Sequence, residues 1–188
     1  MTSAPYDSVL RGAISAHKER QALGLTPYLG ERLSMSVTAL LSLEPDLTRG
    51  RRIAVVPVPS AAAAVRARGF DATWALARVA ARRLAGRHAT VATRVLAQRR
   101  GVGDQAGRTA VERAANLRHG LVLRPVRPPE LAVLVDDLVT TGASLTEAAR
   151  VLSAAGVEVL GAATVAATVR LRRPRERGVG LEIGNLGG

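Results

Sequence analysis

The residues best suited to chemistry in this chain follow the apolar run ELAVLV at 130–135. Two acids come first, Asp136 and Asp137, and a loop of small and hydroxyl-bearing residues comes next: Thr140, Thr141, Gly142, Ala143 and Ser144. Carboxylates can accept hydrogen bonds from ligand hydroxyls or meet a magnesium ion. Hydroxyls can donate to phosphate oxygens, and glycine lets the backbone approach a ligand closely. A sugar phosphate offers partners for both groups.

The flanking sequence predicts how these residues are positioned. The run 130–135 is typical of a buried strand, and residues 142–155 of a helix that stops at Gly156. Free N–H groups at the helix amino end would bind an anion. One alternative stays open: Ser144 and Glu147 fit a capping box, in which Ser144 only starts the helix.

The rest of the chain alternates helical and strand-like segments. Helices are expected at 6–23, 27–43 and 70–85, and strands at 53–58, 89–96, 120–125, 130–135 and 157–169. Residues 44–52 read as a connector, 97–110 as a flexible stretch and 170–188 as a loosely ordered tail. This order predicts an α/β domain with a mostly parallel sheet, in which Asp136 and Asp137 face the ligand crevice at the strands' carboxyl ends.

Composition narrows the function further. The 188 residues are 47% hydrophobic and include no cysteine, which excludes a disulfide, a thiolate nucleophile and a Cys-ligated zinc site. The histidines are scattered and expected at the surface: His17, His88 and His119. The net charge of +12 comes almost wholly from arginine, Lys18 being the only lysine. That surplus favours phosphates, nucleotides or nucleic acid as partners, or reflects a compositional use of arginine as the default surface charge.

Other phosphate-binding and targeting signals do not fit. Lys18 lies in no GxxxxGK[ST] motif, and no GxGxxG follows a strand. The first residues lack the pattern of a signal peptide, and no apolar run reaches membrane-spanning length. We therefore expect a cytoplasmic protein without membrane insertion.

The segment VLVDDLVTTGAS at 133–144 resembles the phosphoribosyl-pyrophosphate (PRPP) motif of type I phosphoribosyltransferases. The chain as a whole is similar to the ComF family (competence-protein and GntX-like) within that class. The similarity runs from 6 to 170 and includes YDSVLRGAISAHKER, VVPVPS and RARGFD, followed by Gln105, Arg113 and Asn116.

The resemblance implies a type I phosphoribosyltransferase fold with three parts: an N-terminal helical hood at 1–50, a core at 51–170 and a basic tail at 171–188. It implies that Asp136 and Asp137 hold the ribose hydroxyls and, directly or indirectly, Mg²⁺. Residues 140–144 would wrap the 5′-phosphate. The pyrophosphate would meet Val58, Pro59, Ser60 and Arg68.

The remaining roles also come from the resemblance. Residues 97–113 would close over the site, Lys18 would belong to the acceptor-binding hood, and the catalytic residues would be Asp136, Asp137, Arg68 and Arg113. The transfer needs no protein nucleophile, because the protein positions PRPP and stabilises the leaving pyrophosphate. Two departures matter: the cysteine-rich zinc finger of many relatives is missing, and Thr140 replaces the aspartate of 6-oxopurine transferases.

Three functions follow from these observations. The first is phosphoribosyl transfer from PRPP to an unknown nitrogenous acceptor, with release of pyrophosphate. The second is a non-catalytic PRPP- or nucleotide-binding accessory protein of DNA uptake, which binds single-stranded DNA electrostatically. The third is a structural domain with a vestigial site. A homo-oligomer is left open.

Overall fold

The computed structural model describes residues 8–99, 120–139, 141–166, 168–171 and 181–182. The helices are α1 (Ser8–Glu19), the short 3-10 helix η1 (Leu23–Leu25), α2 (Thr26–Leu41), α3 (Pro45–Thr48), α4 (Ala62–Arg68), α5 (Ala72–Leu84) and α7 (Ala143–Ala154). The strands are β1 (Arg52–Pro57), β2 (Ala89–Ala92), β3 (Leu96–Gln98), β4 (Leu121–Leu123), β5 (Leu131–Asp136), β6 (Glu158–Thr164), β7 (Thr168–Leu171) and β8 (Leu181–Glu182).

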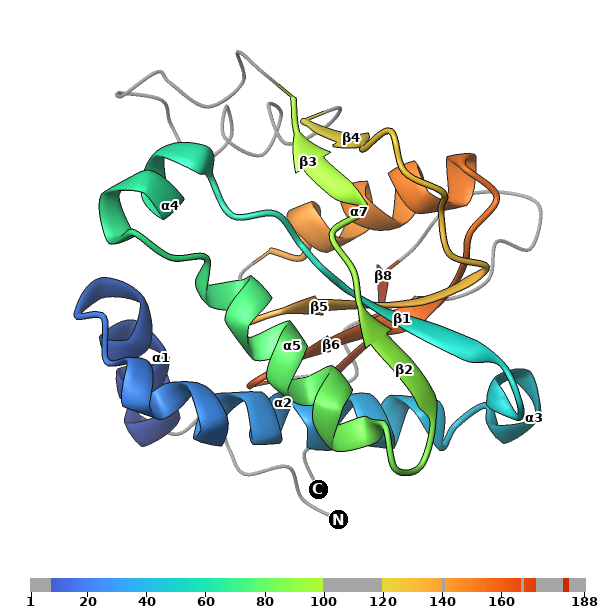
Figure 1. Ribbon diagram of the computed structural model, residues 1–188, viewed down its shortest axis with the longest axis horizontal. Coiled ribbons are helices and arrows are strands. Elements are labelled where there is room, and N and C mark those ends of the chain that lie inside the picture. Colours follow the sequence, from blue (N-terminus) through green and yellow to red (C-terminus); the bar gives the residue numbers. More distant parts are fainter. Residues whose placement is uncertain (1–7, 100–119, 140, 167, 172–180, 183–188) are drawn as a thin grey trace.

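A twisted sheet forms the middle layer of the molecule (Figure 1). Its strand order is β2-β1-β5-β6-β7-β8. The four strands from β2 to β6 pair in parallel, whereas β7 and β8 are added antiparallel at one edge. The predicted α/β class and the mostly parallel sheet are therefore confirmed.

The two middle strands, β1 and β5, are apolar along nearly their whole length because both faces of the sheet are covered. On one face, α2 and α5 contribute Leu29, Leu33 and Leu76 to a cluster with Ile53 and Val133. On the other face, α7 packs Leu145 and Leu152 against Ala132 and Leu134. The alternation of Val133 and Leu134 between the two clusters follows from the period of two along a strand.

Two predicted strands are wrong in extent. The stretch 89–96 is not one strand: β2 ends at Ala92, and β3 pairs antiparallel with β4 in a separate two-stranded ribbon. Consecutive burial of Val95 and Leu96 against the α7 side breaks the alternation of a single strand. The stretch 157–169 likewise splits, because the chain turns after β6 and returns as β7.

Other boundaries shift by smaller amounts. The first helix ends at Glu19 rather than near 23, and Gln21 follows with a positive φ of 52°. The connector 44–52 contains α3, and α4 was not predicted. Most of the expected flexible stretch 97–110 and the expected C-terminal tail lie outside the described residues. In the part of the chain that is described, no helix combines the length and apolar character needed to cross a bilayer.

The close packing of α2 on α5 depends on Gly30, and its replacement is the first prediction. A Cβ added at Gly30 would lie 2.5 Å from Cβ of Val79 on α5. Val79 is β-branched and cannot swing away. We expect Gly30→Ala to lower the free energy of unfolding by about 1–3 kcal/mol in urea titrations.

The matched control is Gly12→Ala in the exposed part of α1. A Cβ at Gly12 meets no atom within 4 Å. This variant should be more stable by about 0.5–1 kcal/mol, the helix preference of alanine over glycine. Equal stability changes at the two positions would contradict the proposed packing.

Candidate functional site

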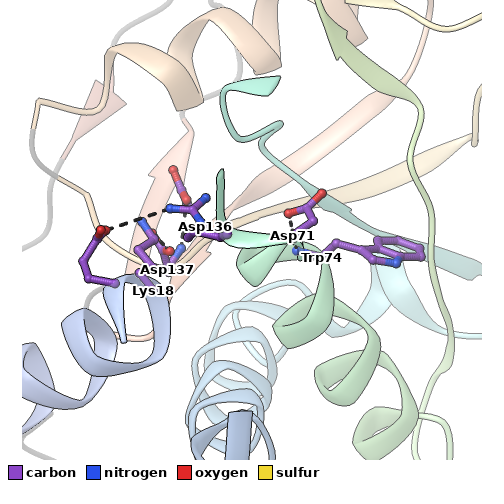
Figure 2. A network of polar contacts seen from close by, with 7 residues as sticks. Lys18, Asp71, Trp74, Asp136 and Asp137 are labelled. Carbon is purple, nitrogen blue, oxygen red and sulfur yellow. Dashed lines mark hydrogen bonds and ion pairs between the residues drawn. The ribbon is translucent and has the colours of Figure 1, made fainter. Parts of the chain in front are cut away.

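The acid pair lies at the carboxyl end of β5, the strand between β1 and β6 (Figure 2). Asp136 is the last residue of the strand and is half-buried, whereas Asp137 is only 1% exposed. The backbone N–H of Asp137 donates to Asp136 Oδ1 over 2.9 Å. The two carboxylates are thus held in fixed places at the sheet edge where α/β proteins bind ligands.

Lys18 supplies the positive charge that Asp137 needs. Its Nζ lies 2.5 Å from Asp137 Oδ2 and joins α1 to the end of β5, as Figure 2 shows. That oxygen is buried and makes no hydrogen bond of good geometry with the described residues, so the ion pair is its compensation. The predicted acceptor-binding lysine is therefore in contact with an acid of the predicted PRPP motif.

Arg68 lies in the same region. Its side chain is 14% exposed, and Nη1 lies 4.0 Å from Glu19 Oε1 on α1. Its Nε is buried and has no hydrogen-bond partner within the described residues. A guanidinium with a free buried donor can stabilise an incoming anion more than a solvated one can.

His17 is buried, so the prediction of a surface histidine is wrong there. Only 1% of it is exposed, because it shares the inner face of α1 with Ile14 three residues earlier. Nε2 lies 2.9 Å from Thr26 Oγ1, and the ring meets Phe70 edge-on at 5.3 Å. Burial lowers the pKa of His17; the charge of Asp137 opposes this shift, and nearby Lys18 adds to it. The imidazole is a neutral packing element beneath Lys18.

The pKa of Asp136 is raised to about 8, first by burial and then by the charge of Asp137. The backbone N–H of Asp137 and the charge of Lys18 act in the opposite direction and do not offset it. One cation therefore serves two carboxylates. The pair has room, in electrostatic terms, for a further cation or for hydroxyl donors from a ligand.

The loop after the acids ends in a glycine that begins α7. Gly142 is the N-cap, with φ 71° in the left-handed region, and no side chain caps the helix. The capping-box alternative is wrong, because the cap lies two residues before Ser144 and Glu147 instead binds Arg150 through two contacts of 2.8 Å. Ala143 N donates weakly to Thr141 Oγ1 at 3.4 Å. Thr140 is outside the described residues.

The predicted pyrophosphate loop follows β1, next to β5 in the sheet. Val58 N donates to Val135 O over 2.9 Å, which ties the loop to the strand that carries the acids. Val58 is buried, and Pro59 and Ser60 are half-buried. Arg113 falls outside the described residues, so the structure does not place it.

The structure thus gathers Lys18 and Arg68 at the end of β5 with the acid pair, and it reveals His17 as their buried support. Sequence reasoning missed the support because a histidine between polar residues carries no mark of burial. The periodicity of α1 holds the only signal, since Ile14 and His17 lie on one helical face.

A bound metal would depend on few protein ligands. No cluster of three or more His, Cys, Asp or Glu side chains able to hold a metal occurs among the described residues. Mg²⁺ commonly binds one or two carboxylates and completes its shell with water and substrate phosphates. Asp136, half-buried and deficient in positive partners, fits such an ion better than Asp137, which Lys18 already occupies.

A central-strand acid pair followed by a glycine-started helix defines an α/β domain that binds an anionic, hydroxyl-bearing ligand. The family model for the phosphoribosyl transferase domain matches residues 71–179, more than half of the chain. The chain therefore belongs to the phosphoribosyl transferase domain family. The match includes the acids and the loop before α7, but it begins after Arg68 and the loop at 58–60. No curated protein matches the chain.

Replacement of Asp136 should reveal its raised pKa as a pH-dependent stability. The ordinary pKa of 3.8 applies in the unfolded chain, and about 8 in the folded one. Folding then takes up a proton between these values, and the carboxyl destabilises the fold progressively as pH rises through that window. Asp136→Asn should be more stable than the parent by about 1–3 kcal/mol above pH 8. The advantage should shrink toward zero near pH 3.8 in urea titrations. A gain that ignores pH would contradict the assignment.

The Lys18–Asp137 pair should show strong energetic coupling. A double-mutant cycle with Lys18→Met and Asp137→Asn should give a coupling energy of about 1–3 kcal/mol, because each single variant leaves a charged partner in a poorly solvated place. The control cycle uses Arg49 and Asp46, which lie 3.8 Å apart with side chains 82% and 92% exposed. That surface pair should couple by less than about 0.5 kcal/mol. Similar coupling in both cycles would contradict the buried role of Lys18.

Proposed function

We propose that this protein binds PRPP and transfers its phosphoribosyl group to a nitrogenous acceptor, with release of pyrophosphate. The observation that carries the proposal is the acid pair at the end of β5, followed by the Gly142-started amino end of α7. These features provide hydroxyl acceptors and a phosphate cradle side by side. Membership of the phosphoribosyl transferase domain family supports the same ligand.

The proposed contacts divide the ligand among separate elements. Asp136 and Asp137 accept hydrogen bonds from the ribose hydroxyls, and the segment 140–144 binds the 5′-phosphate. The pyrophosphate meets the loop at 58–60, with Arg68 as a second contact. Support for Arg68 comes from its buried, unpartnered Nε. Arg113 is assigned a catalytic role by resemblance alone.

The proposed chemistry needs positioning and charge rather than a nucleophile. The ribose carbon becomes cation-like as pyrophosphate leaves, so catalysis rests on fixed contacts and on stabilisation of the leaving charge. Mg²⁺, held with Asp136 and the substrate's own oxygens, would neutralise part of the pyrophosphate charge. Lys18 keeps Asp137 compensated, and His17 supports Lys18 from below.

Finer assignments remain proposals of the same kind. We assign the chain to the ComF branch, without a zinc finger, and with a division at 1–50, 51–170 and 171–188. Within the first part, α1 faces the acids whereas α2 packs under the sheet. Thr140, in place of an aspartate, argues against hypoxanthine or guanine as acceptor. A cytoplasmic location and a homo-oligomer are not argued further.

The accessory role in DNA uptake is the weaker alternative. Its support is the net charge of +12. Single-strand binders usually stack bases on aromatic side chains, and this chain has only Tyr6, Tyr28, Phe70 and Trp74. Trp74 is engaged by Arg94, which lies 4.4 Å from its ring centroid. Binding to single-stranded DNA would then be electrostatic, non-specific and steeply dependent on salt.

Calorimetry with PRPP and Mg²⁺ tests the proposal. The parent should bind PRPP, and Asp137→Asn combined with Thr141→Ala should abolish that binding, because both a hydroxyl acceptor and a loop hydroxyl are lost. Thr141→Ala alone, which leaves the Lys18 ion pair intact, should weaken binding by about tenfold, the effect of one charge-assisted hydrogen bond.

The matched control is Asp46→Asn, a neutralised acid on the exposed helix α3 that should leave PRPP affinity unchanged. Circular dichroism should show that every variant is folded. A pyrophosphate-release screen over candidate bases then separates the transferase from a protein that binds without turnover. PRPP affinity that is equal in parent and double variant would overturn the site.

A further inference from the structure

A second basic hollow lies beside the loop at 58–60. It is a cavity of about 360 Å³ between that loop, α4 and the β3–β4 ribbon. Its polar lining consists of Ser60, Arg66, Asp71, Arg94, Gln98 and Arg124. The rest is mostly apolar, with Val58, Val65 and Leu96 among the contributors. A hollow of this size falls in the range of small-molecule sites.

The charge of this cavity is uncompensated. Three guanidinium groups face one carboxylate, which leaves two positive charges in excess. Asp71 is committed twice: it caps α5 by accepting from Trp74 N at 3.2 Å, and it pairs with Arg94 at 3.2 Å. Arg124 uses its Nε on Leu96 O at 3.1 Å, which leaves its terminal nitrogens free of that bond. The Arg66 side chain has no ion pair or hydrogen bond with the residues that the structure describes.

The cavity is separate from the acid pair. None of Asp136, Asp137 or Lys18 lines it. The helix α4 divides its arginines between the two places, because Arg68 reaches toward Glu19 on the hood side whereas Arg66 lines the cavity. In Figure 2, Asp71 and Trp74 lie to one side of Asp136, Asp137 and Lys18. The loop at 58–60 is the shared wall.

We propose that this cavity is a second ligand site, which takes an organic phosphate of about mononucleotide size. Arg66 and Arg124 bind the phosphate, since their guanidinium forks match its oxygens. Arg94, fixed between Asp71 and the Trp74 ring, adds a rigid positive wall. The apolar lining from Val58, Val65 and Leu96 accommodates the body of the ligand. The site goes beyond phosphoribosyl transfer and does not depend on it.

Calorimetry with AMP at physiological salt tests the second site. AMP should bind saturably, and adenosine, which lacks the phosphate, should bind at least about tenfold more weakly. Arg66→Gln should weaken AMP binding by about tenfold for the loss of one charge-assisted contact. Arg124→Gln should do the same, but it also removes the bond to Leu96 O, so Arg66→Gln is the cleaner variant.

Two controls separate this site from the acid pair and from diffuse charge. Asp137→Asn combined with Thr141→Ala should leave AMP affinity unchanged while PRPP binding is lost, so failure of one proposal is distinguishable from failure of the other. Arg87→Gln, at an exposed arginine between α5 and β2, should leave AMP affinity unchanged.

Three outcomes would overturn the second site. One is no saturable AMP binding at millimolar concentration. Another is AMP binding that falls in the acid-pair double variant and not in Arg66→Gln, which would place AMP at the acids. The last is an equal loss in Arg66→Gln and Arg87→Gln, which would mean attraction by net charge alone.

Discussion

The arrangement of this molecule depends on the placement of two adjacent carboxylates at the end of its middle strand. Burial and mutual repulsion make that arrangement costly, as the raised pKa of Asp136 records. Lys18 offsets half of the charge by reaching Asp137 from α1. An N-terminal helix is thereby fixed over the carboxyl edge of the sheet. The same ion pair compensates the acids and positions the hood, and it leaves Asp136 as the acid that still lacks a positive partner.

The helices beneath that contact serve the same constraint. His17 fills the space under Lys18 and is anchored by Thr26 and Phe70, which come from the start of α2 and the turn before α5. Burial keeps the imidazole neutral, so it adds no second positive charge next to Lys18 and Arg68. Gly30 lets α2 pack against Val79 of α5 without a side chain between them. Close helix packing and the buried polar contacts therefore support one another.

Sequence reasoning succeeded where the physics is local. A run of apolar residues buried on both faces predicts β5, and the acids after it must then lie at the ligand edge. It failed where a distant segment decides. Nothing near 93 or 166 marks a turn by glycine or proline, so two strands were predicted where four occur. The partner of Lys18 lies 119 positions away, beyond any spacing rule. At Ser144 two local signals competed, and the left-handed Gly142 starts the helix because only glycine adopts that conformation without cost.

The arginine surplus acquires meaning only when each guanidinium is traced to its partner. Several are consumed by neighbouring acids: Arg150 by Glu147, Arg51 by Glu158 and Arg94 by Asp71. These arginines are structural and fit the view that arginine is simply the default cation of this chain. Arg68 and Arg66 differ, because each keeps nitrogen donors without a protein partner among the described residues. They lie two residues apart on α4 and face opposite sides of the loop at 58–60. The net charge therefore matters less than the division of two unsatisfied arginines between the acid edge and the neighbouring cavity.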